Sequence, residues 1–201
     1  QYDDVLNRQR EIVYSIRNDV LLEEDPGKIL IELVEEEVEG RVGGIPLTEF
    51  KATRVEDMPE MESLLASWVN VTFPLSVPLE DLIGKSEDEV KALLLEKITG
   101  AYDGKRKLED PDQLQSLERY VVVNAVDVHW QDHLTEMDEL RRSVGLRGYG
   151  QKDPLSEYKN EAFRAFEEMM VSMRSDVCSG MFRSSTNLAA LENILSNLSN
   201  V

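Results

Sequence analysis

Cysteine is almost absent from this sequence of 201 residues, since Cys178 is the only one. An intrachain disulfide is therefore impossible, which favours a reducing compartment over an oxidised, secreted scaffold. No run of ~18 apolar residues occurs, so no segment is expected to span a membrane. The sequence also lacks a start methionine and a signal peptide, and a charged amphipathic pattern begins at once. We therefore expect a piece of a longer intracellular protein.

Basic residues are scarce, with 22 lysines and arginines against 40 aspartates and glutamates and a formal net charge of -18. This balance argues against duplex nucleic acid as a partner, because phosphate binding requires a basic face. The acid is concentrated in residues 25–117, which carry 10 basic and 21 acidic side chains. A content of 41% hydrophobic and 31% charged residues suits a packed core with long exposed helices.

Recognisable catalytic motifs are also missing, and no Gly-x-Ser-x-Gly sequence occurs. Gly84-Lys85-Ser86 resembles the end of a phosphate-binding loop, but that motif requires a glycine where this chain has Leu79. Ser86 is followed three residues later by Glu89, so a helix-capping box explains it better. We therefore predict neither a catalytic site nor a nucleotide site in this chain.

His129 and His133 lie one helical turn apart, a spacing at which two imidazoles can share a metal ion. A zinc hydrolase helix places glutamate directly after the first histidine, but Trp130 stands there and no cysteine lies nearby. A packing or surface role on a helix explains both residues better, so we predict no metal site. A metal hydrolase stays an alternative that stoichiometric zinc binding would support.

Apolar residues recur at helical spacing along most of the chain and no βαβ pattern is present, so we predict an all-α fold. Asp25-Pro26 and Asp153-Pro154 are each expected to cap and begin a helix. Helices are predicted over residues 2–22, 26–39, 59–69, 86–98, 112–144 and 154–177, with a short one over 188–198. Four glycines are expected to end or interrupt helices: Gly40, Gly100, Gly104 and Gly145. Residues 41–59 and 70–79 are expected to be irregular or extended.

The two longest predicted helices, 112–144 and 154–177, are joined by a short loop and must fold back as an antiparallel pair. Met169, Met173 and Cys178 share an apolar stripe on the second of these helices. Methionine-rich faces also serve as adaptable binding surfaces, but a place in the core is the simpler interpretation.

The loop between these helices differs in charge from the rest of the chain. Residues 141–152 hold four basic side chains and no acidic one. A solvated turn would account for the arginines at a helix end. It would not account for the apolar Leu146 and Tyr149 among glycines at the tip of a projecting rod. These residues therefore indicate contact with a partner.

Three ordered motifs resemble one known family. The first is Tyr2-Asp3-Asp4-Val5 with Asn7-Arg8-Gln9-Arg10. The second is Trp130-Gln131-Asp132-His133-Leu134, followed by Met137-Asp138 and Leu140-Arg141. The third is Leu146-Arg147-Gly148-Tyr149 with Gln151-Lys152-Asp153-Pro154, Glu157-Tyr158 and Phe163. In order and spacing they are similar to the scaffold helix, finger helix and finger loop of SecA, the motor of the bacterial preprotein translocase. Residues 25–117 resemble that family only in position, length and a Leu-Pro-Leu-like segment near 74–82.

The resemblance implies long scaffold helices with an antiparallel two-helix finger and an inserted, small, mostly helical wing. Residues 1–24 and 118–183 would form the helical scaffold domain, with the finger inside its second part. Residues 25–117 would form the helical wing domain, and residues 184–201 a weakly helical tail.

In the family the finger lies over the cytoplasmic mouth of the SecY channel, and a tyrosine at its tip contacts the translocating chain. Motif alignment makes that residue Tyr149. The implied contact residues at the tip are Leu146, Arg147, Tyr149, Gln151 and Lys152. The implied scaffold motif comprises Tyr2, Asp3, Asp4, Arg10, Trp130 and His133. One departure is Ser143-Val144-Gly145, where many members have Gly-Ile-His, so an imidazole next to the tip is lost.

The resemblance also places several functions outside this chain. Nucleotide-binding domains with ATP and magnesium and a preprotein cross-linking domain would precede residue 1, and a zinc-binding tail would follow residue 201. We therefore assign no enzyme activity, cofactor or metal to these residues. The expected partners are the SecYEG channel, a preprotein and the missing nucleotide-binding domains. Scaffold surface left uncovered would favour a homodimer.

The function so implied is that of a non-catalytic module in an ATP-driven Sec translocase, cytoplasmic and peripherally associated with the inner membrane. It would couple motor motion to the channel and the polypeptide through the finger. The alternative is a free-standing helical adaptor that works without a motor.

Overall fold

The computed structural model describes residues 2–44, 60–73, 75–147 and 153–184, with the backbone alone for residues 60–63 and 145–147. Its elements are α1 (Tyr2–Leu22), α2 (Gly27–Gly43), α3 (Glu60–Thr72), the 3-10 helix η3 (Leu79–Asp81), α4 (Glu87–Leu108), α5 (Pro111–Arg147) and α6 (Pro154–Arg183). These residues contain no strand, which confirms the predicted all-α fold. No helix in the described ranges is long and apolar enough to cross a bilayer.

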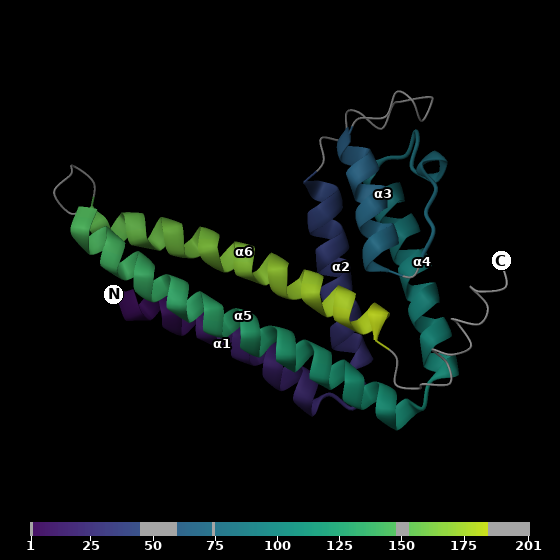
Figure 1. Ribbon diagram of the computed structural model, residues 1–201, viewed down its shortest axis with the longest axis horizontal. Helices are drawn as coiled ribbons and strands as arrows, with labels where there is room; N and C mark the ends of the chain where they lie inside the picture. Colours follow the sequence, from purple (N-terminus) through teal and green to yellow (C-terminus); the bar gives the residue numbers. More distant parts are fainter. Residues whose placement is uncertain (1, 45–59, 74, 148–152, 185–201) are drawn as a thin grey trace.

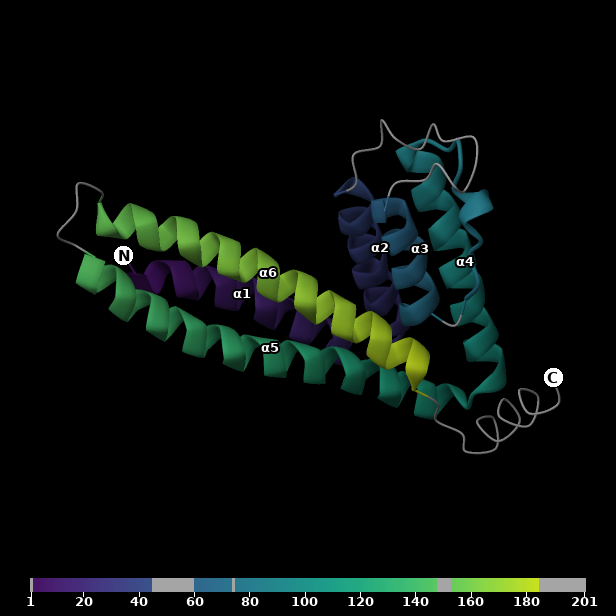
Figure 2. The ribbon, with the colours of Figure 1, turned by 45° about the horizontal axis from the view of Figure 1, so that its top comes forward.

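The molecule has two parts, which we name the rod and the head (Figure 1). The rod consists of α1, α5 and α6, and the head consists of α2, α3, η3 and α4. Within the rod, α5 and α6 form the predicted antiparallel hairpin, and α1 lies along both of them. The 37 residues of α5 make a helix about 55 Å long at 1.5 Å per residue. The head stands at the end of the rod away from the hairpin loop (Figure 2).

Two predicted helix starts are confirmed by their capping contacts. The Ser86 side chain accepts from the Glu89 backbone N–H at 3.4 Å, and Glu89 Oε2 accepts from the Ser86 N–H at 2.7 Å. The Asp153 side chain accepts from the Leu155 N–H at 3.3 Å, with Pro154 in the first turn of α6. Gly84, at φ +72°, forms the left-handed turn that precedes the Ser86 cap.

The prediction that glycines end the helices was wrong. α2 continues through Gly40, α4 continues through Gly100 and Gly104, and α5 continues through Gly145. A glycine inside a helix costs about 1 kcal/mol relative to alanine. Burying one large apolar side chain contributes about 1.5–3 kcal/mol. Fully buried neighbours on the same helices therefore outweigh the glycines, namely Val38 and Val42 in α2 and Ile98 in α4.

Asp25 does not cap α2, which corrects a second prediction. Pro26 occupies the cap position without a side-chain hydrogen bond. The Asp25 carboxylate instead accepts from the Arg106 guanidinium on α4, at 3.1 and 3.2 Å. The prediction that residues 41–59 are irregular was wrong at its start, because α2 extends to Gly43. The rest of that segment, residues 45–59, and the predicted short helix over 188–198 lie outside the described residues.

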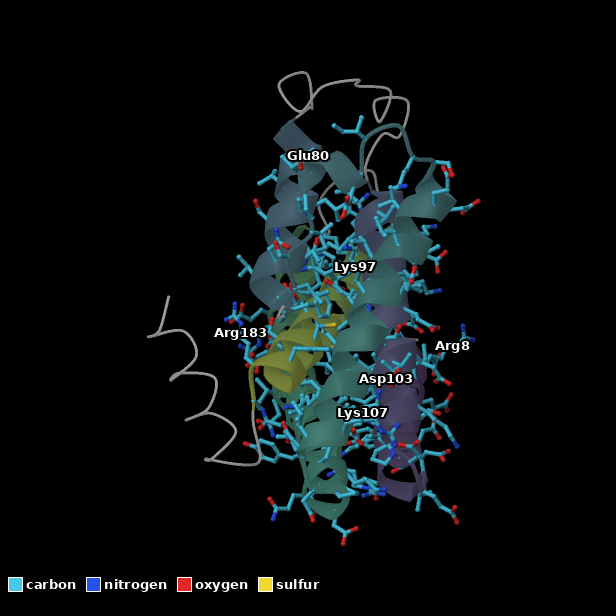
Figure 3. All side chains as sticks on the ribbon, turned by 90° about the vertical axis from the view of Figure 1, so that its right-hand side faces the viewer. Arg8, Glu80, Lys97, Asp103, Lys107 and Arg183 are labelled. Carbon is cyan, nitrogen blue, oxygen red and sulfur yellow. The ribbon has the colours of Figure 1, made fainter. Side chains whose placement is uncertain are left out.

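One hydrophobic core runs from the rod into the head. It includes Val13 of α1, Leu30 of α2, Ile98 of α4 and Val122 of α5. The core also takes in Met169, Met173 and Cys178 of α6, which confirms that the methionine stripe faces inward. From the head end, α4 carries Lys97, Asp103 and Lys107 on its outer face, and Arg183 lies at the end of α6 (Figure 3). The domain boundaries at 24/25, 117/118 and 183/184 stay predictions.

Candidate functional site

The rod is fastened together by polar contacts between α1 and α5, which we call the seam. Along α1 the contacting residue numbers rise, while along α5 they fall, so the contacts define one antiparallel register. They are Asp3 Oδ1 with Arg141 Nη1 at 3.2 Å, Gln9 Oε1 with His133 Nε2 at 3.0 Å, Arg17 Nε with Asp127 Oδ1 at 2.9 Å, and the Glu23 carbonyl with Arg119 Nη2 at 2.8 Å.

The centre of the seam joins all three helices of the rod. Gln9 Nε2 donates to the Ala162 carbonyl of α6 at 3.0 Å. Gln9 Oε1 is therefore the acceptor toward His133, so His133 Nε2 carries the hydrogen. His133 is 1% exposed, and its Nδ1 has no hydrogen-bond partner among the described residues. Burial lowers the pKa of His133, which keeps the imidazole neutral.

Aromatic rings surround this central contact. The Trp130 and His133 ring centroids lie 5.6 Å apart, and those of His133 and Phe166 lie 5.7 Å apart. Tyr14 of α1 approaches the edge of Trp130 at 6.5 Å. The Trp-x-x-His spacing of the sequence motif thus places both rings on the buried side of α5, and it gives these residues a packing role.

At the hairpin end of the seam, Tyr2 packs edge-to-face on Tyr158 with centroids 4.6 Å apart. The Arg141 guanidinium lies 5.5 Å from the Tyr2 ring centroid. The Asp3–Arg141 ion pair is largely exposed, at 75% and 54% for the two side chains, so it contributes little stability. Asp4 lines a surface groove with Arg8 and Lys159.

Arg10 of the predicted scaffold motif has its hydrogen bond within α1. Its Nη1 donates to Asn7 Oδ1 at 3.2 Å, and the contact is exposed. The structure therefore does not bring Arg10 to the seam.

The predicted finger tip lies at the margin of the described residues. Leu146 and Arg147 belong to the last turn of α5, and nothing is described of their side chains. Tyr149, Gln151 and Lys152 lie outside the described residues. Contact between these five residues and a polypeptide or channel therefore stays a prediction.

The two histidines of the metal alternative have separate partners. His129 Nε2 lies 2.7 Å from Asp176 Oδ2 on α6, whereas His133 bonds to Gln9 on α1. Within the described ranges, no group of three or more histidine, cysteine, aspartate or glutamate side chains is arranged to hold a metal ion. These contacts assign both imidazoles to helix packing.

Sequence reasoning missed a buried polar cluster where the head meets the rod. The Tyr102 hydroxyl of α4 donates to Glu118 Oε1 of α5, and the Arg106 guanidinium stacks 5.6 Å from the Tyr102 ring centroid. Glu118 is 1% exposed, and its Oε2 has no partner among the described residues. Burial raises the pKa of Glu118, although the Tyr102 hydrogen bond acts in the opposite direction. The sequence did contain a signal for the burial of Glu118, because this residue falls on an apolar stripe between Leu114 and Val121.

We expect the His133 contact to make the stability of the chain depend on pH. The pKa of His133 in the folded chain lies below the ordinary histidine value of 6.5, so just below that pH the unfolded chain binds a proton that the folded chain does not. Stability is therefore fully present above about pH 6.5 and is lost as the pH falls, by at most about 1.4 kcal/mol per pH unit. Urea unfolding at a series of pH values measures this. His133→Gln, which can still donate to Gln9, should have the shallower dependence, and equal slopes would contradict the assignment.

Comparison with known proteins identifies the family. The family described as the SecA wing and scaffold domain matches residues 1–185. The protein translocase subunit SecA of Heliobacterium modesticaldum is 38% identical over 183 residues, covering 91% of this chain and 21% of its own length. The SecA subunit of Synechococcus sp. strain WH7803 is 40% identical over 190 residues, covering 90% of this chain and 19% of its own length. The chain thus spans about a fifth of the length of these relatives. With a match over nearly its whole length, this chain belongs to the SecA wing and scaffold domain family.

Proposed function

We propose that this chain is the non-catalytic wing and scaffold module of an ATP-driven Sec preprotein translocase. In this role the rod would transmit the motion of nucleotide-binding domains to the SecY channel and to the translocating polypeptide. The α5–α6 hairpin is the two-helix finger of the proposal, and the head is its wing. The module would work on the cytoplasmic side, peripherally associated with the inner membrane.

The observation that carries the proposal is the seam. A hairpin of two long helices would bend under load if it were held at one end alone. Here α1 contacts α5 at intervals from Asp3 to Glu23, so the third helix supports the hairpin along most of its length. A displacement of α1 is therefore transmitted to both finger helices at once, because Gln9 contacts His133 and Ala162 together.

The charge distribution supports a contact at the loop end of the rod. Residues 141–152 carry four basic side chains and no acidic one, on a chain of net charge -18. A basic tip on an acidic body would orient the rod toward an acidic or polar partner. Leu146 and Tyr149 would add apolar contacts for a polypeptide in transit.

Loosening the seam inside the complete translocase subunit tests the proposal. We expect Gln9→Leu combined with Arg17→Leu to leave ATP hydrolysis in place while the amount of preprotein moved per ATP falls severalfold. These changes remove the contacts to His133, Ala162 and Asp127 without touching the tip. Preprotein transport into membrane vesicles and phosphate release are measured on the same sample.

Arg10→Ala is the matched control, because Arg10 lies on the same helix and, among the described residues, hydrogen-bonds to its neighbour Asn7 rather than to α5 or α6. It should leave the ratio of transport to hydrolysis unchanged. An unchanged ratio in the Gln9 and Arg17 variant would overturn the transmission role. The adaptor alternative would be favoured by two results together: the isolated chain binds the channel fully, and the seam variant transports as much preprotein as the parent.

A further inference from the structure

The outer face of α3 is apolar and uncharged, although it is exposed. Residues 63–79 form the longest stretch of the sequence without a charged side chain, in a chain where 31% of all residues are charged. Burial in the core accounts for such residues as Val69 and Phe73. It does not account for Leu64 and Val71, whose side chains are 60% and 63% exposed. An exposed apolar pair on an uncharged stretch of helix points to a segment that covers it.

The spacing of this pair defines a socket for one large side chain. Leu64, Ser67, Trp68 and Val71 stand at positions i, i+3, i+4 and i+7 of α3. Four side chains in this arrangement form the hole that receives a side chain of a neighbouring helix in knobs-into-holes packing. Trp68 is half-buried and forms one wall, while the small, exposed Ser67 leaves the hole open between the two apolar residues. The outer face of α3 is therefore shaped for a second helix.

The end of α6 is fastened beside this face. Arg183 Nη2 donates to the Val71 carbonyl at 2.7 Å, and Arg183 lies at the end of α6 (Figure 3). The carbonyl of the next residue, Ser184, accepts from Lys105 Nζ of α4. The chain therefore leaves α6 next to the C-terminal end of α3, and residues 185–201, which we call the C-terminal segment, continue from there.

The sequence of the C-terminal segment matches the socket. It contains one charged residue, Glu192, so it resembles the outer face of α3 in carrying almost no charge. A leucine stripe runs through it with the 3-4-3 spacing of a helical seam, at Leu188, Leu191, Leu195 and Leu198. Leu188 and Leu195 are seven residues apart, as are Leu64 and Val71, so in a helix each pair spans about 10 Å.

The link between α6 and this stripe is long enough to reach α3. The four residue steps from Ser184 to Leu188 extend to about 14 Å, whereas the axes of packed helices lie about 8–10 Å apart. Because the segment starts at the C-terminal end of α3, a helix that lies along this face must run antiparallel to α3.

We infer that residues 188–198 form a helix that packs antiparallel on the outer face of α3. Leu188 then lies near Val71, Leu195 lies near Leu64, and Leu191 inserts into the hole between them. The C-terminal segment thus covers the apolar face of the head and fastens the head to the end of the rod. This assignment does not depend on the proposed function.

A competing site on α4 is less suited to the leucine stripe. Leu108 is 75% exposed and lies one turn from Lys105, which bonds to Ser184. Its neighbours Arg106 and Lys107 are charged, so this end of α4 offers one leucine among basic side chains. A stripe of four leucines would leave most of its apolar surface uncovered there.

Hydrogen exchange followed by mass spectrometry on the full 201-residue chain tests the inference. The backbone amides of residues 188–198 should be protected in the parent. Leu64→Ser combined with Val71→Ser should abolish this protection and leave the amides of α2 and α4 protected, because both replaced side chains are exposed and the core is untouched. Leu108→Ser is the matched control, since it removes an exposed leucine equally close to Ser184, and it should keep the protection.

Three results would overturn the inference. The first is a C-terminal segment that exchanges like an unfolded peptide in the parent. The second is protection that survives the double serine variant, or that is lost in Leu108→Ser and so assigns the segment to α4. The third is protection that disappears on dilution, which would mean that the segment packs on α3 of a second copy of the chain.

Disulfide formation provides an independent test of the antiparallel register. In a Cys178→Ala background, which removes the buried native thiol, Leu64→Cys with Leu195→Cys should form an intramolecular disulfide under mild oxidation. Leu64→Cys with Asn193→Cys is the matched control, because position 193 lies on the opposite side of the expected helix, and it should oxidise much more slowly. Equal rates for the two pairs would contradict the packing of the leucine stripe on α3.

Discussion

Tyr102→Phe should destabilise the chain by about 3 kcal/mol, an unusually large loss for removal of one oxygen atom. The hydroxyl donates to Glu118, which is almost completely buried, and the second carboxylate oxygen has no partner in the described part of the chain. Removing the donor leaves a buried carboxylate without a hydrogen bond, and that penalty exceeds the net value of the bond itself. Urea unfolding followed by circular dichroism at neutral pH measures the loss.

Two companion variants separate this mechanism from a simple packing effect. Glu118→Gln keeps an acceptor for Tyr102 and removes the charge, so it should cost less than about 1 kcal/mol or stabilise the chain. Tyr102→Phe with Glu118→Met replaces both partners by apolar groups and should recover most of the loss. An additive loss in the double variant would contradict the account.

The Tyr102→Phe loss should also shrink as the pH is lowered. Burial raises the pKa of Glu118 in the folded chain above the ordinary glutamate value of 4.5, so the folded chain takes up a proton at a higher pH than the unfolded chain. Acidification toward pH 4.5 therefore favours the folded state, and most of all in the variant that lacks the hydroxyl. A loss that is constant across this range would mean that Glu118 is not the group left unpaired.

Gly27→Ala should destabilise the chain by about 2 kcal/mol, although alanine is the better helix former. A methyl group on Gly27 would lie 2.1 Å from the Tyr102 hydroxyl and 3.1 Å from Asp25 Oδ1. The ring must shift, and with it the hydrogen bond to Glu118, so overpacking and loss of the bond act together. In the Tyr102→Phe background the cost should be smaller, because the atom that the methyl group meets is gone.

Gly100→Ala is the matched control, and it should raise the free energy of unfolding instead of lowering it. Gly100 lies inside α4, and a methyl group there would meet nothing within 4 Å. This variant should gain up to about 1 kcal/mol from helix propensity alone. Equal effects of the two alanines would contradict the close approach at Gly27.

Periodicity predicted the helices but not their ends or their partners. Helices α5 and α6 were predicted because their apolar stripes are long and regular, and Asp153-Pro154 supplied a clear start for α6. The glycine positions were misjudged, because the burial that carries α4 through Gly100 and Gly104 depends on neighbours that only the fold brings together.

The sequence could predict only part of the seam. Gln9 lies on an apolar stripe of α1, so its burial could be expected. Its two partners, His133 and the Ala162 carbonyl, lie 124 and 153 residues away, and no local pattern connects them. The motif resemblance singled out Trp130 and His133, and in the structure Trp130 packs against Tyr14 of α1 and His133 against Phe166 of α6.

The central claim is that the finger is the working end of the module, and cross-linking from its tip tests this most directly. In the complete subunit, Cys178 becomes serine, Tyr149 becomes the single probe cysteine, and a preprotein is stalled in membranes that contain the channel. A second probe at Ser172, on the exposed side of α6 far from the loop, serves as the control. We predict cross-links from position 149 to the preprotein or the channel mouth, and few from position 172. A complex that still transports preprotein but gives no cross-link from position 149 would contradict the claim.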